Sequence, residues 1–206
     1  MRTEAFIRDV MHIDDAALVA RLCAISSLRT FSRGEHMLRA GEPQSPVRLL
    51  MSGVARAFEI DAEGNEHTGC LLMHPGTVVV STADLSEPST ATFEALSECE
   101  TVAFDAAGIN ELLQTSLPFS HYFIRCLQAA WNERHSHEEA LRRLRSADRY
   151  LWFLGRYPGL IDRIPKKHVA SFLGMTPVTL SRLRSSLGSV SAASNATGPV
   201  RSWLDS

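Results

Sequence analysis

Apolar residues recur at helical spacing near the start of the chain, over residues 13–28. The segment opens on an Asp-rich stretch, and negative charge favours a helix N-terminus. One face of such a helix would collect the apolar side chains of Ile13, Ala17, Leu18, Leu22, Ile25 and Leu28. This spacing predicts an amphipathic helix over 13–28.

Between Arg29 and Phe104 the pattern changes to short apolar runs separated by glycine or proline. Short runs with turn residues between them favour an antiparallel sandwich or barrel. The segment DAEGN, residues 61–65, lies between two apolar runs and predicts a hairpin loop. In that loop Gly64 or Asn65 is free to take positive φ.

Helical spacing returns after Phe104, first over 106–114 and then over a long segment from Pro118 to about Leu144. A helix of about 27 residues is about 40 Å long, more than a small domain needs. We therefore predict that it joins two protomers; the alternative is that it lies on its own barrel. Its apolar stripe consists of Phe119, Phe123, Cys126, Leu127, Ala130, His137, Leu141 and Leu144. The residues predicted to form the dimer helix contact are Phe119, Phe123, Leu127, Ala130 and His137.

A further helix is predicted after the long one. Ser146 offers an N-cap, Asp148 lies in the first turn, and the helix should end by Tyr157, which Pro158 and Gly159 follow. The stretch 188–199 is small and polar, and we expect it to be mobile.

The segment 165–187, PKKHVASFLGMTPVTLSRLRSSL, predicts two crossed helices. Pro165 can open the first, and Gly174 can take the left-handed conformation that ends it. Thr176 and Pro177 then supply a cap and a first-turn proline for the second. The residues expected to pin the crossing are Val169, Ala170, Leu173, Leu180, Leu183 and Leu187. This spacing is typical of a DNA-binding helix-turn-helix.

The outward side chains of the second helix are short polar groups and arginine, which suit contacts with base edges. Lys166 and Lys167, the only lysines of the chain, lie where phosphate contacts are expected. The alternative is an ordinary pair of core helices with a solvated basic face. The predicted DNA-binding residues are Lys166, Lys167, Thr176, Val178, Thr179, Ser181, Arg182 and Arg184.

Charge is divided unevenly along the 206 residues. Residues 1–141 carry a formal charge of −10 and residues 142–206 carry +8, although the net charge is only −2. This asymmetry favours nucleic-acid contact by the basic part. With 45% hydrophobic and 21% charged residues, the chain has enough apolar material for a core.

Composition also excludes some classes of protein. No apolar run is long enough to span a membrane, and the first ten residues lack a signal peptide's apolar stretch, so we expect a cytoplasmic protein with no membrane contact. Cys23, Cys70, Cys99 and Cys126 are isolated, which predicts reduced, mostly buried thiols rather than a zinc or iron–sulfur site. No metal and no cofactor is predicted.

The order of these elements resembles the Crp/Fnr superfamily of bacterial transcription regulators across essentially the whole chain. The likeness rests on FSRGEHMLRAGEP with LLMSGVARAF, on HPGTVV, and on IPKKHVASFLGMTPVTLSRLR. It implies an α+β fold with an N-terminal antiparallel β jelly-roll barrel, a long dimerisation helix and a C-terminal (winged) helix-turn-helix domain. The corresponding boundaries are 1–117 for a cyclic-nucleotide-binding-like sensor domain, 118–145 for the dimerisation helix and 146–206 for the DNA-binding domain.

The resemblance further implies a homodimer that reads a palindromic operator in double-stranded DNA, with an effector that shifts the long helix. The sequence departs from the family in the ligand cassette after Gly76. Val80 and Ser81 stand where nucleotide-binding members carry glycine and glutamate, and Ser89 and Thr90 stand where they carry arginine and serine.

A buried phosphate needs a cation or several backbone donors. We therefore predict that the barrel does not bind cyclic AMP in the usual way and takes another small-molecule effector or none. Arg48 and Arg56 are the residues that could replace the missing cation. Val178 stands where related readers often carry glutamate, and the sequence after Leu187 predicts a short or absent wing.

Two other functions are left open. A cupin-like metal enzyme would need converging histidines, and His36, His67 and His74 lie in the barrel segment without the required spacing. His135 and His137 would point about 200° apart on one helix. The other alternative is a sensor dimer that does not bind DNA and acts through a protein partner.

Overall fold

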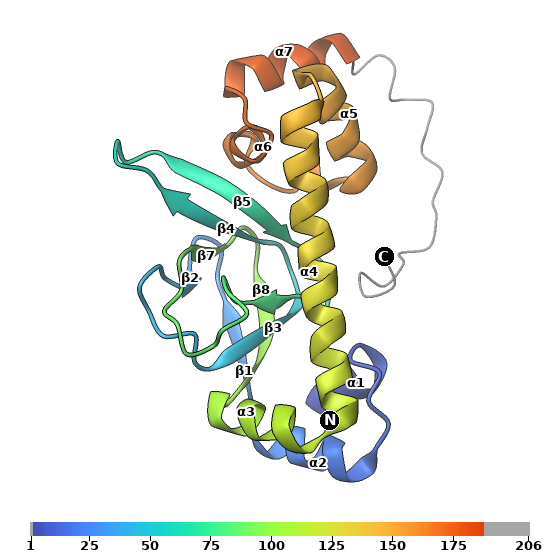
Figure 1. The fold of residues 1–206 in the computed structure, drawn as a ribbon. Helices are drawn as coiled ribbons and strands as arrows, with labels where there is room; N and C mark the ends of the chain where they lie inside the picture. Colours follow the sequence, from blue (N-terminus) through green and yellow to red (C-terminus); the bar gives the residue numbers. More distant parts are fainter. Residues whose placement is uncertain (1, 188–206) are drawn as a thin grey trace.

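The computed structural model describes residues 2–187, which form an α+β chain with a β domain, one long helix and a helical C-terminal part (Figure 1). The strands are β1 (Ser26–Phe31), β2 (His36–Leu38), β3 (Val47–Ser52), β4 (Ala55–Ile60), β5 (Glu66–Leu72), β6 (Val78–Val79), β7 (Thr92–Ala95) and β8 (Cys99–Phe104). The helices are α1 (Arg2–Asp9), α2 (Ala16–Ala24), α3 (Ala106–Thr115), α4 (Leu117–Arg143), α5 (Ser146–Arg156), the short 3-10 helix η1 (Leu160–Asp162), α6 (Lys166–Phe172) and α7 (Pro177–Leu187). The predicted wing and the segment 188–199 lie outside the described residues.

The strands between residues 26 and 104 pair antiparallel, as the alternation of short apolar runs predicted. Within the described residues they form two four-stranded sheets, β1-β8-β3-β6 and β2-β7-β4-β5, rather than one barrel closed by strand pairing. Both sheets contribute to one apolar cluster, for example Phe31 and Leu50 from the first sheet and Ala57 and Phe93 from the second. The predicted hairpin loop is confirmed, because β4 pairs with β5 and Gly64 has φ of 85°.

The N-terminal helix is shorter than predicted. α2 begins after Asp15, whose side chain accepts the N–H of Leu18 at 2.7 Å, and it ends at Ala24. The prediction that it continues to Leu28 is wrong, because residues 26–31 form β1 and pair along their whole length with β8. Ladder hydrogen bonds to a distant strand therefore override the local helical spacing. Helix α1, which buries Phe6 and Ile7, was not predicted from the sequence.

The short helix and the long helix after Phe104 are confirmed as α3 and α4. Ser116 caps α4, and Pro118 lies in its first turn. α4 runs along the β domain and reaches the C-terminal helices at its far end (Figure 1). α5 starts at Ser146 itself, so the prediction that Ser146 is the N-cap is wrong; Arg145 precedes the helix and makes no side-chain capping bond.

The four cysteines are free thiols. Cys99 and Cys126 are buried and the other two are partly buried. Burial raises the pKa of Cys126 to about 11 and that of Cys70 to about 12, so both stay protonated and inert at neutral pH. None of the described helices is both long and apolar enough to cross a membrane.

Gly53, between β3 and β4, is required by the fold. Its φ is 101°, and an added Cβ would lie 2.4 Å from the carbonyl oxygen of Glu98. We expect Gly53→Ala to lower the free energy of unfolding by about 3 kcal/mol, because it adds a backbone clash to a strained conformation. Gly64 has φ of 85° and nothing near its Cβ position, so Gly64→Ala should cost about 1 kcal/mol. Urea unfolding of both variants measures the difference; equal losses would contradict the assignment.

Candidate functional site

α6 and α7 are two short helices joined by a sharp turn. Val169, Ala170 and Leu173 of the first segment are fully buried, and so is Leu180 of α7. Gly174 between them has φ of 59°, the left-handed conformation predicted for it. A Cβ at Gly174 would lie 3.2 Å from a methyl group of Leu141, so the turn also approaches the end of α4 closely.

The start of α7 is capped as the sequence predicted. The hydroxyl of Thr176 accepts the backbone N–H of Thr179 at 3.1 Å, and Pro177 is the first residue of the helix. Thr176 satisfies one free N–H of the first turn, and Pro177 has no N–H that would need a partner. Both residues therefore favour a helix that begins at this point.

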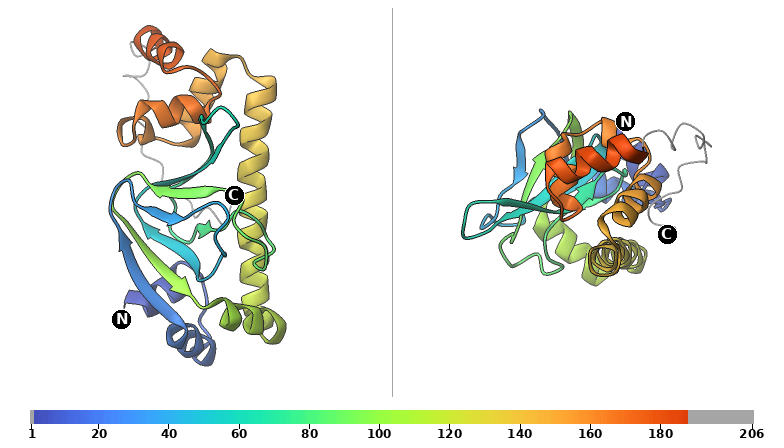
Figure 2. Two further views of the ribbon diagram at one scale, coloured as in Figure 1. Left: turned by 90° about the vertical axis from the view of Figure 1, so that its left-hand side faces the viewer. Right: turned by 90° about the horizontal axis from the view of Figure 1, so that it is seen from above.

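α7 lies at one end of the molecule (Figure 2). Val178 is 59% exposed, and Ser181 and Arg182 are exposed beside it, while Thr179 is half-buried. Within the described part of the chain Arg182 makes no ion pair, whereas Arg184 is bound to Asp162 at 2.6 Å. The structure therefore separates two arginines that the sequence grouped together.

Lys166 and Lys167 are both exposed in the first turn of α6. They lie on the helix that packs against α7. Their assignment to phosphate contacts stays a prediction.

His137 joins α4 to α6. Its Nε2 donates a hydrogen bond to the carbonyl oxygen of Phe172 at 2.7 Å, and its ring stacks on the Phe172 ring with centroids 3.8 Å apart. Burial lowers the pKa of His137, so the neutral ring with a proton on Nε2 makes this contact. His137 therefore lies inside the chain and not on a surface open to a partner, contrary to the sequence-based expectation.

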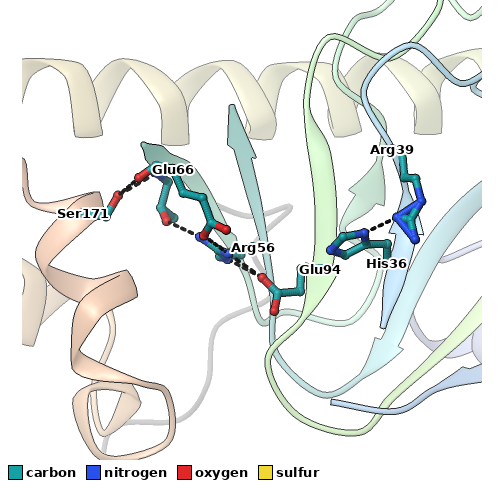
Figure 3. Close-up of polar contacts among 7 residues, drawn as sticks. His36, Arg39, Arg56, Glu66, Glu94 and Ser171 are labelled. Atoms are coloured by element: carbon teal, nitrogen blue, oxygen red, sulfur yellow. Dashed lines mark hydrogen bonds and ion pairs between the residues drawn. The ribbon is translucent and has the colours of Figure 1, made fainter. Parts of the chain in front are cut away.

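A second contact joins the β domain to α6 (Figure 3). β5 is an edge strand, and its free edge is covered by one side chain of α6. The hydroxyl of Ser171 accepts the N–H of Thr68 at 2.9 Å and donates to the carbonyl of Glu66 at 3.0 Å. Covering an unpaired edge in this way satisfies ladder groups that would otherwise face solvent.

Arg56 lies beneath this contact, with 2% of its surface exposed. Its guanidinium binds the carboxylates of Glu66 at 2.5 Å and Glu94 at 2.6 Å (Figure 3). Ala55 and Ala57 on either side point into the core between the sheets, so Arg56 points to the opposite face of its strand. Arg56 therefore does not supply the cation that the cassette lacks. Arg48 is half-buried and donates to the carbonyl of Pro46 at 3.2 Å.

Four of the residues predicted for the ligand pocket, Val80, Ser81, Ser89 and Thr90, lie at the two ends of loop 80–90, and Gly76 precedes this loop. The hydroxyl of Ser81 accepts the N–H of Thr90 at 2.8 Å and lies 3.2 Å from the hydroxyl of Ser89, which is buried. Gly76 begins the segment with φ of 88°. Sequence reasoning missed Gln44, whose side chain accepts the N–H of Ser81 at 2.7 Å; a glutamine in a proline-rich turn carries no local signal of such a role.

The histidines of the β domain have separate partners. His36 contacts Arg39, His67 binds Asp61 at 2.6 Å, and burial lowers the pKa of His74. Across residues 2–187, no three His, Cys, Asp or Glu side chains come together as a metal site would require.

Comparisons with known proteins agree with this architecture. Residues 28–116 match the family described as cyclic nucleotide-binding domain. FixK2 from Bradyrhizobium japonicum has a similar structure, with a TM-score of 0.70, 16% identity, and coverage of 84% of this chain and 90% of that one. The c-di-GMP responsive global regulator CLP from Xanthomonas campestris aligns with a TM-score of 0.65 and 19% identity, over 89% and 96% of the two chains.

A putative transcriptional regulator of the Crp/Fnr family from Eubacterium rectale aligns with a TM-score of 0.68 and 14% identity, over 85% and 84% of the two chains. No curated protein matches the sequence. Residues 28–116 thus match the model of the cyclic nucleotide-binding domain family, and the chain shares its fold with these three solved proteins, one of which is described as a putative regulator of the Crp/Fnr family.

The α6 contact should make stability depend on pH. Burial, and next the charge of Arg56, lower the pKa of His168 to about 4. As pH falls below about 6.5, the unfolded chain binds a proton at His168 and the folded chain does not. The stability contributed by neutral His168 is therefore complete above that pH and is lost towards pH 4.

We expect His168→Gln to reduce the loss of unfolding free energy between pH 7 and pH 4 by about 2 kcal/mol. His121→Gln on the exposed surface of α4 serves as the matched control and should keep the wild-type pH profile. Urea titrations at several pH values provide the measurement. An unchanged profile in His168→Gln would contradict the role given to this side chain.

Proposed function

We propose that the chain is a sequence-specific DNA-binding transcription regulator of the Crp/Fnr type that acts as a homodimer and does not use cyclic AMP as its effector. In this proposal the two sheets are the jelly-roll sensor, α4 is the dimerisation helix, and α6 and α7 are the helix-turn-helix. The observation that carries it is the exposed face of α7, with Arg182 free of ion pairs among the described residues, on a helix whose inner side is firmly packed.

α7 would enter the major groove. Arg182 can bind a guanine through two hydrogen bonds, and the methyl groups of Val178 and Thr179 can contact thymine. Lys166 and Lys167 would bind phosphates and set the position of α7 on the duplex. Arg184 is held by Asp162, so we assign it to orienting α7 rather than to reading bases.

α4 would bring two copies together. Leu117, Ile124 and Trp131 are 67%, 49% and 71% exposed and recur every seven residues, the spacing of a two-helix seam. Leu127 and Ala130 of the predicted seam lie on or beside this face, whereas Phe119 and His137 pack inside the chain. Exposed apolar side chains in a row of this length favour a second copy of the same helix as their partner.

The charged residues of the cassette loop 80–90 support the proposal that cyclic AMP is not the effector. Loop 80–90 contains Asp84 and Glu87 but neither lysine nor arginine, and Arg56 is bound to two carboxylates elsewhere. A cyclic phosphate placed there would lose its hydration without gaining a cation from loop 80–90 or from Arg56.

Arg182→Ala should weaken binding to a selected palindromic duplex by about 1–3 kcal/mol, which is about 5- to 150-fold, and relax the preference at one base pair. The site is first selected from random duplex DNA with the purified protein, and affinities are measured by fluorescence anisotropy. Arg33→Ala, an exposed arginine between β1 and β2, is the control and should bind as the wild type does. Lys166→Ala with Lys167→Ala should instead lower affinity for all sequences and reduce the salt dependence by about two ions.

Failure of the wild-type protein to select any duplex, at any salt concentration, would reject DNA reading. It would favour the alternative in which a sensor dimer acts through a protein partner. Equal affinity of Arg182→Ala and the wild type would reject only the role of that residue.

Trp131→Glu should convert the dimer to a monomer, because it places a charge in the apolar seam. Asn132→Glu introduces the same charge one residue further round α4 and should leave the dimer intact. Sedimentation velocity distinguishes the two states, and circular dichroism checks that α4 stays helical. A wild-type protein that sediments as a monomer at micromolar concentration would contradict the proposed assembly.

A further inference from the structure

We propose that Gln44 takes the place of an effector: it holds the cassette loop 80–90 closed, so that the sensor domain is competent for DNA binding with no ligand bound. This inference rests on the proposed function and goes beyond it, because it assigns the regulation of the sensor to one residue of the chain itself.

The amide of Gln44 is buried, with 1% of the residue exposed, and every polar atom on it is used. Its Nε2, which carries two hydrogens, lies within hydrogen-bond distance of three acceptors: the Thr82 hydroxyl at 3.1 Å and the carbonyl oxygens of Asp84 at 3.2 Å and Glu87 at 3.1 Å. Its Oε1 accepts the N–H of Ser81 at 2.7 Å and lies 3.2 Å from the Ser81 hydroxyl. One side chain thus binds the beginning, the middle and the end of the loop.

The backbone closes the loop in the same arrangement. The N–H of Ser89 donates to the carbonyl of Glu42 at 2.8 Å, and the N–H of Gly41 donates to the carbonyl of Ser89 at 2.7 Å. Ser81 and Thr90 join the two ends directly. The segment that carries Gln44 and the cassette loop therefore form one hydrogen-bonded unit, and buried units of this kind are rigid when every member is satisfied.

The closed loop also packs against an apolar cluster to which α4 contributes. Val80 and Leu85 pack against this cluster, which contains Phe119 and Tyr122 of α4. A loop held in one position by Gln44 therefore contributes to the apolar packing in which the N-terminal half of α4 takes part. Since α4 also contacts α6 through His137, the loop is connected to the DNA-reading helices by packed residues.

The chemistry of the site agrees with a neutral internal group and disagrees with an anionic ligand. The groups that face Nε2 include the carbonyl oxygens of Asp84 and Glu87, which an amide N–H₂ satisfies and which would repel a phosphate. The carboxylate of Asp84 accepts bonds from Ser86, which lower the pKa of Asp84 and keep it negative. A cyclic nucleotide would have to break the bonds of Gln44 and then lie beside this charge.

The experiment compares Gln44→Ala, Gln44→Glu and a matched control, Thr101→Val, in the full-length protein. Thr101 is also fully buried and donates one hydrogen bond, to the carbonyl of Arg29, but it lies outside the cassette. Gln44→Glu keeps the shape and replaces the donor with a carboxylate that faces carbonyl oxygens. Hydrogen exchange of the Ser81 and Thr90 amides reports on the loop, and anisotropy with the selected duplex reports on DNA affinity.

We expect both Gln44 variants to speed exchange at Ser81 and Thr90 and to bind the duplex at least about tenfold more weakly than the wild type and Thr101→Val. The wild type purified without nucleotide should bind fully, and cyclic AMP, cyclic GMP or cyclic di-GMP should change its affinity less than about twofold. If Gln44→Ala does not fold, Gln44→Glu and the nucleotide additions still decide the question.

Two results would overturn the inference: unchanged exchange and affinity in a folded Gln44 variant, or a nucleotide that strengthens wild-type DNA binding about tenfold or more. The proposed function can fail separately. If the wild type binds no duplex, the proposal of DNA reading is rejected, together with the claim of ligand-free competence, whereas the exchange rates alone show whether Gln44 closes the loop.

Discussion

The contact between His137 and Phe172 determines how the two ends of this protein relate to each other. One imidazole donates to a backbone carbonyl at 2.7 Å and stacks on the ring of the same residue, so it fixes both the distance and the rotation of α6 against α4. Trp152 and Tyr157 extend the aromatic contact around Phe172. The proposed DNA-reading helix on the proposed dimer helix needs a fixed direction, and this contact supplies that constraint.

The C-terminal helices also depend on the β domain for part of their core. Val54, Leu71 and Leu96 from the β domain belong to the same apolar cluster as Phe153 and Leu173. The chain changes direction near residue 146, where a domain boundary was expected. The parts before and after this point nevertheless pack together, through this cluster and through the Ser171 contact to β5. The sheets and the helix pair therefore share part of one apolar core in the described arrangement.

The β domain illustrates how a family fold can keep its shape while the chemistry of its site changes. Recognition of an anion needs a cation or several backbone donors, and the charged side chains of loop 80–90 are all acidic. A buried amide gives the same loop both donors and acceptors without any net charge, which avoids the cost of an unpaired buried ion. Hydrogen bonds within the chain therefore occupy the loop where the family resemblance implies a ligand.

The sequence by itself determined the elements whose signals are local. Gly174, Thr176 and Pro177 act on their own turn, so the α6–α7 pair could be predicted with its cap and its left-handed glycine. Tertiary structure decided what depends on distant partners: β1 replaced the end of a predicted helix because β8 pairs with it, and His137 turned inward because α6 lies beside it. Gln44 and Arg56 acquired their roles in the same way, since a single side chain's partners are set by which segments the fold brings together. Spacing along the chain encodes periodicity, but the face that is buried depends on the surface it meets.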